Sequence, residues 1–186
     1  MAQLSPPEDE VLRKLGTTPA SQERVDLLNT ASQERLSKQP KIAERFAREA
    51  FEMADSLDYT LGKGAACSNL GRVLLRKGSN DEAKKLFDEG LEIYTEVNDR
   101  ENMAKLTIDL ATYCIHTGQY DTALVHCERG ADLYGETNNK KGLAGVYNRK
   151  GIIYDYQGNF LKAIDWYQKS MKLNEEIDNP QGLTVN

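Results

Sequence analysis

The sequence predicts an all-α protein, an α-solenoid of about four stacked helix hairpins with a short helix in front of them. Three observations support this fold: a repeat of 40 residues, apolar side chains at helical spacing within each repeat, and polar turns at fixed places in it. The chain has 186 residues and a net charge of −5, with 39% hydrophobic and 28% charged residues. This composition is typical of a folded domain of ordinary size.

The composition also excludes two classes of partner. Basic residues are spread along the chain instead of forming the basic face that nucleic acid requires. No apolar run approaches the roughly 18 residues of a membrane span. We therefore expect no nucleic-acid partner and no membrane contact by this part of the protein.

Small residues recur at intervals of 40 and define the repeat. One column holds alanine throughout: Ala43, Ala83, Ala123 and Ala163. A second column holds Ala31, Gly71, Ala111 and Gly151, and a third holds Gly78, Gly118 and Gly158. The junctions "EVNDRENMA" and "ETNNKKGLA" repeat at the same interval. Such agreement indicates repeated supersecondary units.

The segment "SPPEDEVLRKLG" predicts a short helix, with Ser5 as its cap and Gly16 as its stop. Residues 1–21 are therefore expected to form an N-terminal helix and a linker. The repeat units follow, and we place them at 22–61, 62–101, 102–141 and 142–181, with the start of a fifth at 182–186. Because the last residues match the opening of the fourth unit, we expect the chain to be part of a longer protein.

Each unit is expected to contain two helices. In the second unit, "GAACSNLGRVLLRKG" ends at Gly78, which suits a helix stop, and "DEAKKLFDEGLEIYTEV" opens with acidic residues that favour a helix start. The small residues Gly71, Ala83 and Gly90 allow close helix approach. A hairpin of this size cannot bury both faces, so it must stack on its neighbours.

These columns resemble the tetratricopeptide repeat, which places small residues at its eighth, twentieth and twenty-seventh positions. Here they are Gly71, Ala83 and Gly90; Ala111, Ala123 and Gly130; Gly151, Ala163 and Ser170. The resemblance covers residues 22–186 and implies a right-handed α-solenoid. Two features depart from the family pattern: the period is 40 instead of about 34, and Thr95 and Glu175 stand where a proline is usual.

The 40-residue form is similar to repeats of bacterial signalling proteins and of kinesin light chain. The opening segment, residues 21–57, is similar to a bacterial group in which such repeats form the sensory half of histidine kinases, nucleotide cyclases or transcription regulators. This resemblance implies a protein- or peptide-binding sensory or scaffold domain of a larger bacterial signalling protein. The sequence as given suggests a cytoplasmic protein, and a periplasmic one if a signal peptide was removed before Ala2-Gln3.

The resemblance also implies a binding face, because the first helices of such hairpins line the inner wall of the stack. The family's inward positions map to Asn69, Arg72, Arg76, Lys105, Asp109, Thr112, His116, Asn148, Arg149, Asp155 and Tyr156. Apolar points on this wall are Leu75, Ile108, Ile115 and Ile152. Mixed polar and apolar groups suit an extended peptide or a partner helix. The same composition also suits a solvated face, and the sequence leaves both interpretations open.

One subfamily of these repeats binds the C-terminal carboxylate of chaperones through a clamp of Lys, Asn and Arg side chains. We reject this function for the present chain, because its residues do not match the whole clamp. Asn69 and Lys105 match two clamp positions, but Asp109 stands where a cation is needed and would repel a carboxylate. Leu28 and Ser32 replace the first pair of the clamp.

The search for catalytic, metal or cofactor sites gives no candidate. His116 and His126 have no cluster of ligands around them. Cys114 and Cys127 occupy bulky core columns and are expected to be buried thiols, with a disulfide between them as the less favoured alternative. The glycines at 62–64 and 142–145 lack a phosphate-loop pattern and are expected at a helix junction. We therefore expect no enzyme, metal or cofactor here, although an output domain beyond this segment could be enzymatic.

A structural role is the alternative to ligand binding. The repeats could mainly form a homodimer or an assembly through the last repeat or the aromatic surface around Trp166 and Tyr167.

Overall fold

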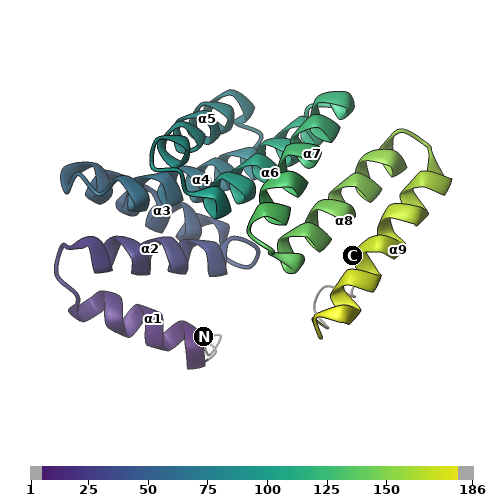
Figure 1. The fold of residues 1–186 in the computed structure, drawn as a ribbon. Coiled ribbons are helices and arrows are strands. Elements are labelled where there is room, and N and C mark those ends of the chain that lie inside the picture. The colour runs from purple at the N-terminus through teal and green to yellow at the C-terminus, as the bar shows by residue number, and fades with distance from the viewer. Residues whose placement is uncertain (1–5, 180–186) are drawn as a thin grey trace. The chain divides into compact units, whose positions relative to one another are not determined.

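The computed structural model describes residues 6–179, in which all regular structure is helical. The elements are α1 (Pro6–Thr17), α2 (Gln22–Arg35), α3 (Pro40–Ser56), α4 (Thr60–Lys77), α5 (Asn80–Glu96), α6 (Arg100–His116), α7 (Tyr120–Glu136), α8 (Lys140–Tyr156) and α9 (Phe160–Glu176). Figure 1 shows the nine helices of this described part in chain order. The expected fifth unit at 182–186 and the Ser5 cap lie outside the described residues.

The helix bounds confirm an all-α architecture of consecutive hairpins: α2–α3, α4–α5, α6–α7 and α8–α9. The second helices begin at Pro40, Asn80, Tyr120 and Phe160, at intervals of 40 residues. None of the described helices combines the length and the apolar composition needed to cross a membrane. The chain forms two compact units, Met1–Ile93 and Tyr94–Asn186, which are described separately.

In the first unit, α1 packs on α2, α2 on α3, and α4 on both α2 and α3. The core that α1 shares with the first hairpin contains Leu15 of α1 together with Val25, Leu28 and Phe46, each at most 6% exposed. α1 thus covers apolar surface of the first hairpin. The expected stop at Gly16 is wrong by one residue, because α1 continues to Thr17 and Gly16 keeps an ordinary helical backbone.

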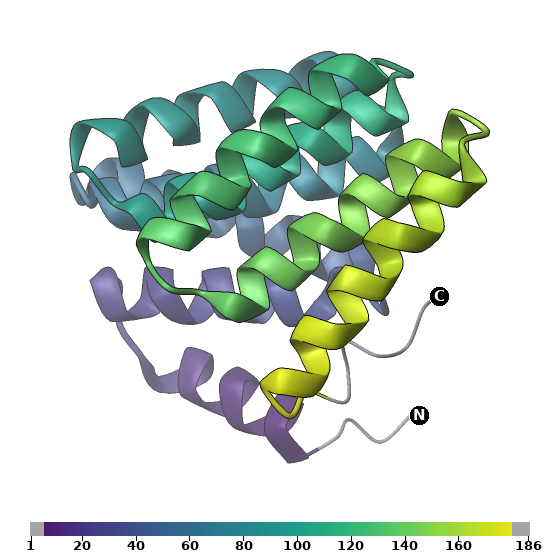
Figure 2. The same cartoon turned by 45° about the vertical axis from the view of Figure 1, so that its right-hand side comes forward.

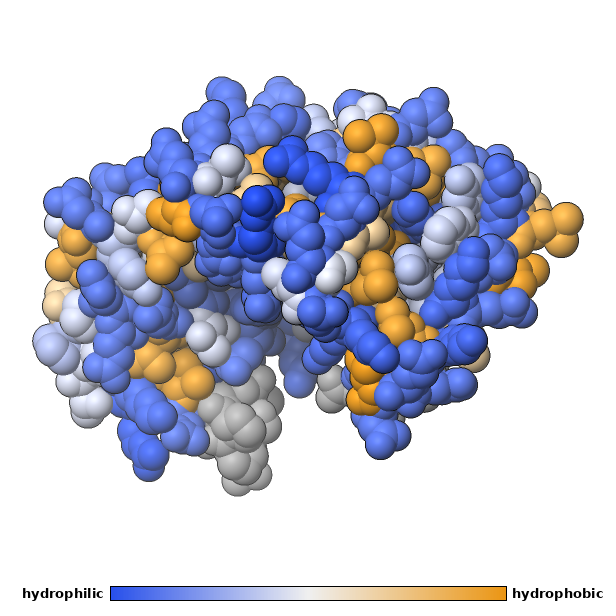
Figure 3. Space-filling model, in the orientation of Figure 1, coloured by the Kyte–Doolittle hydropathy of each residue, from blue (hydrophilic) through white to orange (hydrophobic). Residues whose placement is uncertain are grey.

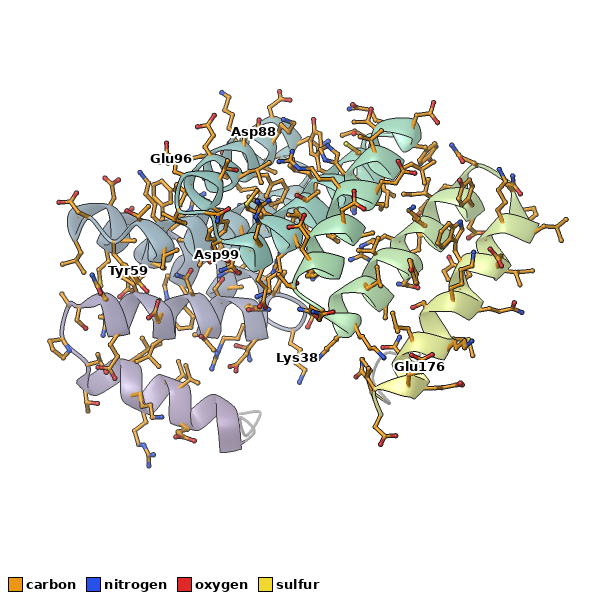
Figure 4. All side chains as sticks on the ribbon, viewed as in Figure 1. Lys38, Tyr59, Asp88, Glu96, Asp99 and Glu176 are labelled. Carbon is orange, nitrogen blue, oxygen red and sulfur yellow. The ribbon has the colours of Figure 1, made fainter. Side chains whose placement is uncertain are left out.

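In the second unit, α8 packs against α7 and α9, as Figure 2 shows. The first helices α6 and α8 also contact each other, and no contact of that extent joins α7 to α9 within the described residues. Capping side chains set the helix starts. The Asp99 carboxylate, labelled in Figure 4, accepts a hydrogen bond from the N–H of Asn102 at 3.0 Å, and the Asn139 side chain does the same for Gly142 at 2.8 Å.

The turns repeat as regularly as the helices. Gly78, Gly118 and Gly158 follow first helices with φ of 82°, 74° and 72°. After each hairpin, the left-handed position is Asp58, Asn98, Asn138 or Asp178. Asn and Asp tolerate this conformation better than most residues, because their short side chains bond locally. The first hairpin differs: Lys38 stands in the glycine column (Figure 4), has no left-handed backbone, and α2 ends at Arg35.

The small-residue columns lie where the helices touch. All four alanines of the Ala43 column are at most 2% exposed. A Cβ on Gly71 would lie 2.5 Å from Phe87 Cε1, and one on Gly151 would lie 2.5 Å from Tyr167 Cε1. The predicted role of these glycines in close packing is therefore confirmed. Some apolar residues of the second helices stay accessible, because Ile42 is 37% and Met171 is 39% exposed.

Candidate functional site

The expected binding wall comes from the first helices α4, α6 and α8. Within each unit, first helices contact one another: α2 with α4, and α6 with α8. In the second unit the second helices are less closely associated. First helices thus lie on the closely spaced side, where an inner face is expected in stacked hairpins.

In the first unit, two wall residues join α4 to α2. Asn69 is 7% exposed, and its Nδ2 donates to the backbone oxygen and to Oδ1 of Asn29, both at 3.1 Å. Asn29 Nδ2 in turn donates to the backbone oxygen of Gly62 at 3.0 Å. Arg76 is exposed, and its Nη1 donates to the Leu36 carbonyl at 3.2 Å. Arg72, between them, is half-buried.

In the second unit, α6 supplies four wall residues with different surroundings. Lys105 is exposed and pairs with Glu101 at 2.9 Å. Thr112 Oγ1 donates to the Ile108 carbonyl of its own helix at 2.9 Å. Asp109 is half-buried, and His116 is exposed at the end of the helix.

Helix α8 supplies the other four wall residues. Asn148 and Arg149 are half-buried, whereas Asp155 and Tyr156 are exposed. The Nε atom of Arg149 is buried and has no hydrogen-bond partner among the described residues. This atom stands out because buried polar groups are nearly always hydrogen-bonded. Tyr156 stacks on Tyr120, with ring centroids 6.0 Å apart and an interplanar angle of 9°.

The apolar side chains of the wall are more deeply buried than its polar side chains. Leu75 is 6% exposed, and Ile115 and Ile152 are half-buried. Ile108 packs on α7, because a Cβ on Gly130 would lie 2.6 Å from Ile108 Cδ1. What remains accessible on this side is mainly polar.

The cysteines are not arranged for chemistry. Cys67, Cys114 and Cys127 are buried and not disulfide-bonded, which confirms the expectation of buried thiols and gives no disulfide between Cys114 and Cys127. Burial raises the pKa of Cys67 and of Cys127 to about 12. Because the thiolate is the nucleophile, these two thiols are held in their unreactive form. No group of three metal-ligating side chains occurs within the described residues.

Gly62 and Gly142, near the starts of α4 and α8, lie where aromatic side chains pack closely. A Cβ on Gly62 would lie 2.3 Å from Tyr59 Cδ1, and one on Gly142 would lie 2.4 Å from Tyr134 Cε1. The tyrosine rings therefore occupy the space that a side chain would need. Tyr59 is held in turn by a hydrogen bond from its hydroxyl to Asp26 at 3.1 Å.

Sequence reasoning missed Asn29, which completes the buried amide pair. The signal was present, since Asn29 precedes Asn69 by one repeat. It was overlooked because the first unit is the least regular. The same column continues as Asp109 and Arg149, so its chemistry changes from amide to charged along the chain.

Comparisons with known proteins agree with the repeat. A family model described as "Tetratricopeptide repeat" matches residues 64–136 and 102–176, together more than half of the chain. A search of curated protein sequences found no match.

Solved structures share the fold at low sequence identity. A Rap protein complexed with Competence and Sporulation Factor has a TM-score of 0.85 at 16% identity, covering 95% of this chain and 50% of its own. The Rap conjugation gene regulator of plasmid pLS20, in complex with the Phr* peptide, has a TM-score of 0.79 at 14% sequence identity. The match covers 94% of this chain and 49% of that protein. A signal transduction ATPase with a tetratricopeptide repeat sensor from Pyrococcus horikoshii has a TM-score of 0.72 at 14% sequence identity. The match covers 94% of this chain and 27% of that protein. The chain therefore spans about half or less of these proteins.

Proposed function

The chain belongs to the tetratricopeptide repeat family, and from this premise we propose that it is a non-catalytic domain that binds a peptide or an extended segment of a partner protein. The ligand lies along the faces of the first helices. In the second unit this face is formed by α6 and α8, which contact each other and present Asp109, Thr112, Asn148 and Arg149.

The observation that carries this proposal is the buried Nε atom of Arg149, which lacks a hydrogen-bond partner among the described residues. A buried polar group without a partner typically costs about 1–3 kcal/mol. A carboxylate or backbone carbonyl of a bound chain would satisfy the guanidinium by a charge-assisted hydrogen bond. Nearby apolar side chains, including half-buried Ile152, give a ligand some apolar contact.

We further propose that the domain is the sensory or scaffold part of a bacterial signalling protein. Two proteins with this fold are described in complex with a factor or a peptide, and a third carries its repeats as a sensor. In such a protein, occupancy of the first-helix face would alter an output carried elsewhere.

Selection from a library of random short peptides tests the binding proposal. The dissociation constant of the recovered peptides is then measured for the wild type and for Arg149→Met, which keeps much of the side chain's length but removes the guanidinium. We expect Arg149→Met to weaken binding by about tenfold or more, as for a charged hydrogen bond worth about 1.5–3 kcal/mol.

The matched control is Arg129→Met, since Arg129 is an exposed arginine on the second helix α7. It should leave the dissociation constant unchanged, and the helical circular dichroism of both variants should match the wild type. Failure to recover any binding peptide, or equal binding by Arg149→Met, would place the function elsewhere.

A further inference from the structure

Helix α9 carries four exposed large apolar side chains, Phe160, Leu161, Ile164 and Met171. Leu161 is 84%, Ile164 52% and Met171 39% exposed, whereas Ala163, Ser170 and Asn174 of the same helix are buried. Figure 3 shows hydrophobic surface at its right edge, over the beginning of α9. We call Leu161, Ile164, Asp165, Gln168, Met171 and Lys172 the α9 outer strip.

Of the aromatic residues of α9, Phe160 is 63% exposed beside Leu161, whereas Trp166 and Tyr167 are half-buried. Lys150 Nζ lies 4.7 Å and Lys169 Nζ 4.2 Å from the centre of the Trp166 ring, so the indole is flanked by two cations. Tyr167 is half-buried and packs on Gly151. An interface through α9 would therefore use Phe160 and the aliphatic side chains instead of Trp166 and Tyr167.

The residues of the strip depart from the repeat pattern at two positions. The position of Leu161 is occupied in the other second helices by Lys41, Asp81 and Asp121, all exposed. The position of Lys172 is occupied by Glu52, Glu92 and Asp132, which are all acidic.

These departures are not explained by a following hairpin. α4 packs on α3 and α8 packs on α7, yet α3 and α7 still carry charged residues at both positions. A second helix that packs only against the next hairpin therefore still has charged residues at the positions equivalent to Leu161 and Lys172. The leucine and the reversed charge of α9 indicate a contact that the other second helices lack.

We propose that the α9 outer strip binds the same strip of a second copy of this chain, with the two helices antiparallel about a two-fold axis near Gln168. Such an axis makes the interface self-complementary. Residues equally far from the axis in opposite directions then meet. Asp165 and Lys172 are equally far from an axis midway between Gln168 and Lys169, so each comes opposite the other residue of the second copy. Ile164 and Met171 each precede one of these charged residues and supply apolar contact beside the pair.

Charge complementarity selects this occupant. The amino-terminal half of the strip offers an acidic side chain and the carboxy-terminal half a basic one, so antiparallel pairing brings opposite charges together twice. Leu161 comes near Glu175 and Glu176 of the second copy, since long charged side chains cover apolar surface with their stems. A strip this small predicts a weak, concentration-dependent dimer.

Sedimentation velocity from micromolar to millimolar protein tests the proposal with charge-swap variants. Asp165→Lys and Lys172→Asp each place like charges opposite one another, so each should weaken dimerisation by about tenfold or more. The double variant restores opposite charges across the axis and should recover association close to the wild type. Leu161→Lys, which gives α9 the residue that α3 has, should also weaken association.

The control is Val125→Lys, which changes an apolar residue 62% exposed on α7 and should leave the dimer unaffected. A monomeric wild type at all concentrations overturns the proposal, as does a double variant no better than the single ones. The readout is independent of peptide binding: the Arg149→Met variant should dimerise like the wild type, so failure of the proposed function and failure of this inference are distinguishable.

Discussion

Asn69 Nδ2 donates hydrogen bonds to the backbone oxygen and to Oδ1 of Asn29, the residue that lies one repeat earlier in the sequence. The bond joins equivalent positions of the successive first helices α2 and α4. Both residues are less than 8% exposed, so this pair is a buried polar link between two hairpins. Its function is structural, whereas the equivalent Arg149 keeps a buried Nε atom without a partner among the described residues.

Replacing Asn69 by aspartate should destabilise the protein. The change removes the donor and sets a carboxylate beside the two oxygens of Asn29, so that buried polar groups lose their partner. We expect a loss of about 1–3 kcal/mol in the free energy of unfolding. Urea denaturation followed by far-UV circular dichroism measures it. Gln33→Glu makes the same amide-to-acid change at an exposed site of α2 and should cost no more than about 0.5 kcal/mol. Equal stability of both variants would contradict the structural role.

Adding one methyl group should have opposite effects at two helical glycines. In Gly71→Ala the new Cβ meets the Phe87 ring, which should cost about 1–3 kcal/mol through overpacking. A Cβ added to Gly145 in α8 would have no neighbouring atom within 4 Å, so Gly145→Ala should stabilise the protein by about 0.5–1 kcal/mol through helix propensity. Thermal or urea unfolding measures both. A neutral Gly71→Ala would show that Phe87 can move aside at little cost.

The ion pair between Glu44 and Lys77 should give a small acid sensitivity. A hydrogen bond from Lys77, with a second from Arg48, holds the pKa of Glu44 below its ordinary value of 4.5. A lowered folded-state pKa means that the contribution is complete above about pH 4.5 and is lost as the pH falls through the folded value. Because Lys77 is half exposed, we expect less than about 1 kcal/mol.

Glu44→Gln provides the measurement for this pair. Its unfolding free energy should lie below that of the wild type at neutral pH, and the difference should shrink in acid. A difference that stays constant down to acid pH would assign the effect to packing and not to charge.

Thiol reactivity should report unfolding. A pKa of about 12 for Cys67 and Cys127 leaves about a thousandfold less thiolate at a given mildly alkaline pH than the ordinary value of 9.0. Both thiols should therefore resist alkylation in the native protein and react after denaturation. Mass spectrometry should then find all three cysteines labelled without a reductant. Labelling of Cys67 alone would indicate a disulfide between Cys114 and Cys127.

The hairpins could be predicted because their causes are local and repeated. The glycine at 78, 118 and 158 ends a helix through its own backbone freedom, and the small residues at 83, 123 and 163 mark where helices meet. The left-handed residues at 58, 98, 138 and 178 follow the same interval. The first hairpin was harder to delimit, because Lys38 replaces the glycine of the column.

The candidate wall was predicted only as a set of positions. Spacing places Asn69 and Arg149 in one column of the repeat. It does not predict that Asn69 is hydrogen-bonded to Asn29, or that Arg149 Nε has no hydrogen-bond partner among the described residues. Similarly, spacing assigned Ile108 to the wall, whereas packing turns it toward Gly130. These differences depend on which side chains neighbouring helices bring into contact.

The sequence by itself determined the helical class, the 40-residue repeat and the pairing of helices, since each follows from backbone preferences and apolar spacing within a few turns. The tertiary structure alone decided which polar atoms are satisfied, which aromatic rings are covered, and which aliphatic residues of α9 stay exposed. The physical reason is that hydrogen-bond partners and burial depend on contacts between helices. Equal spacing along the chain does not determine which side chains make those contacts.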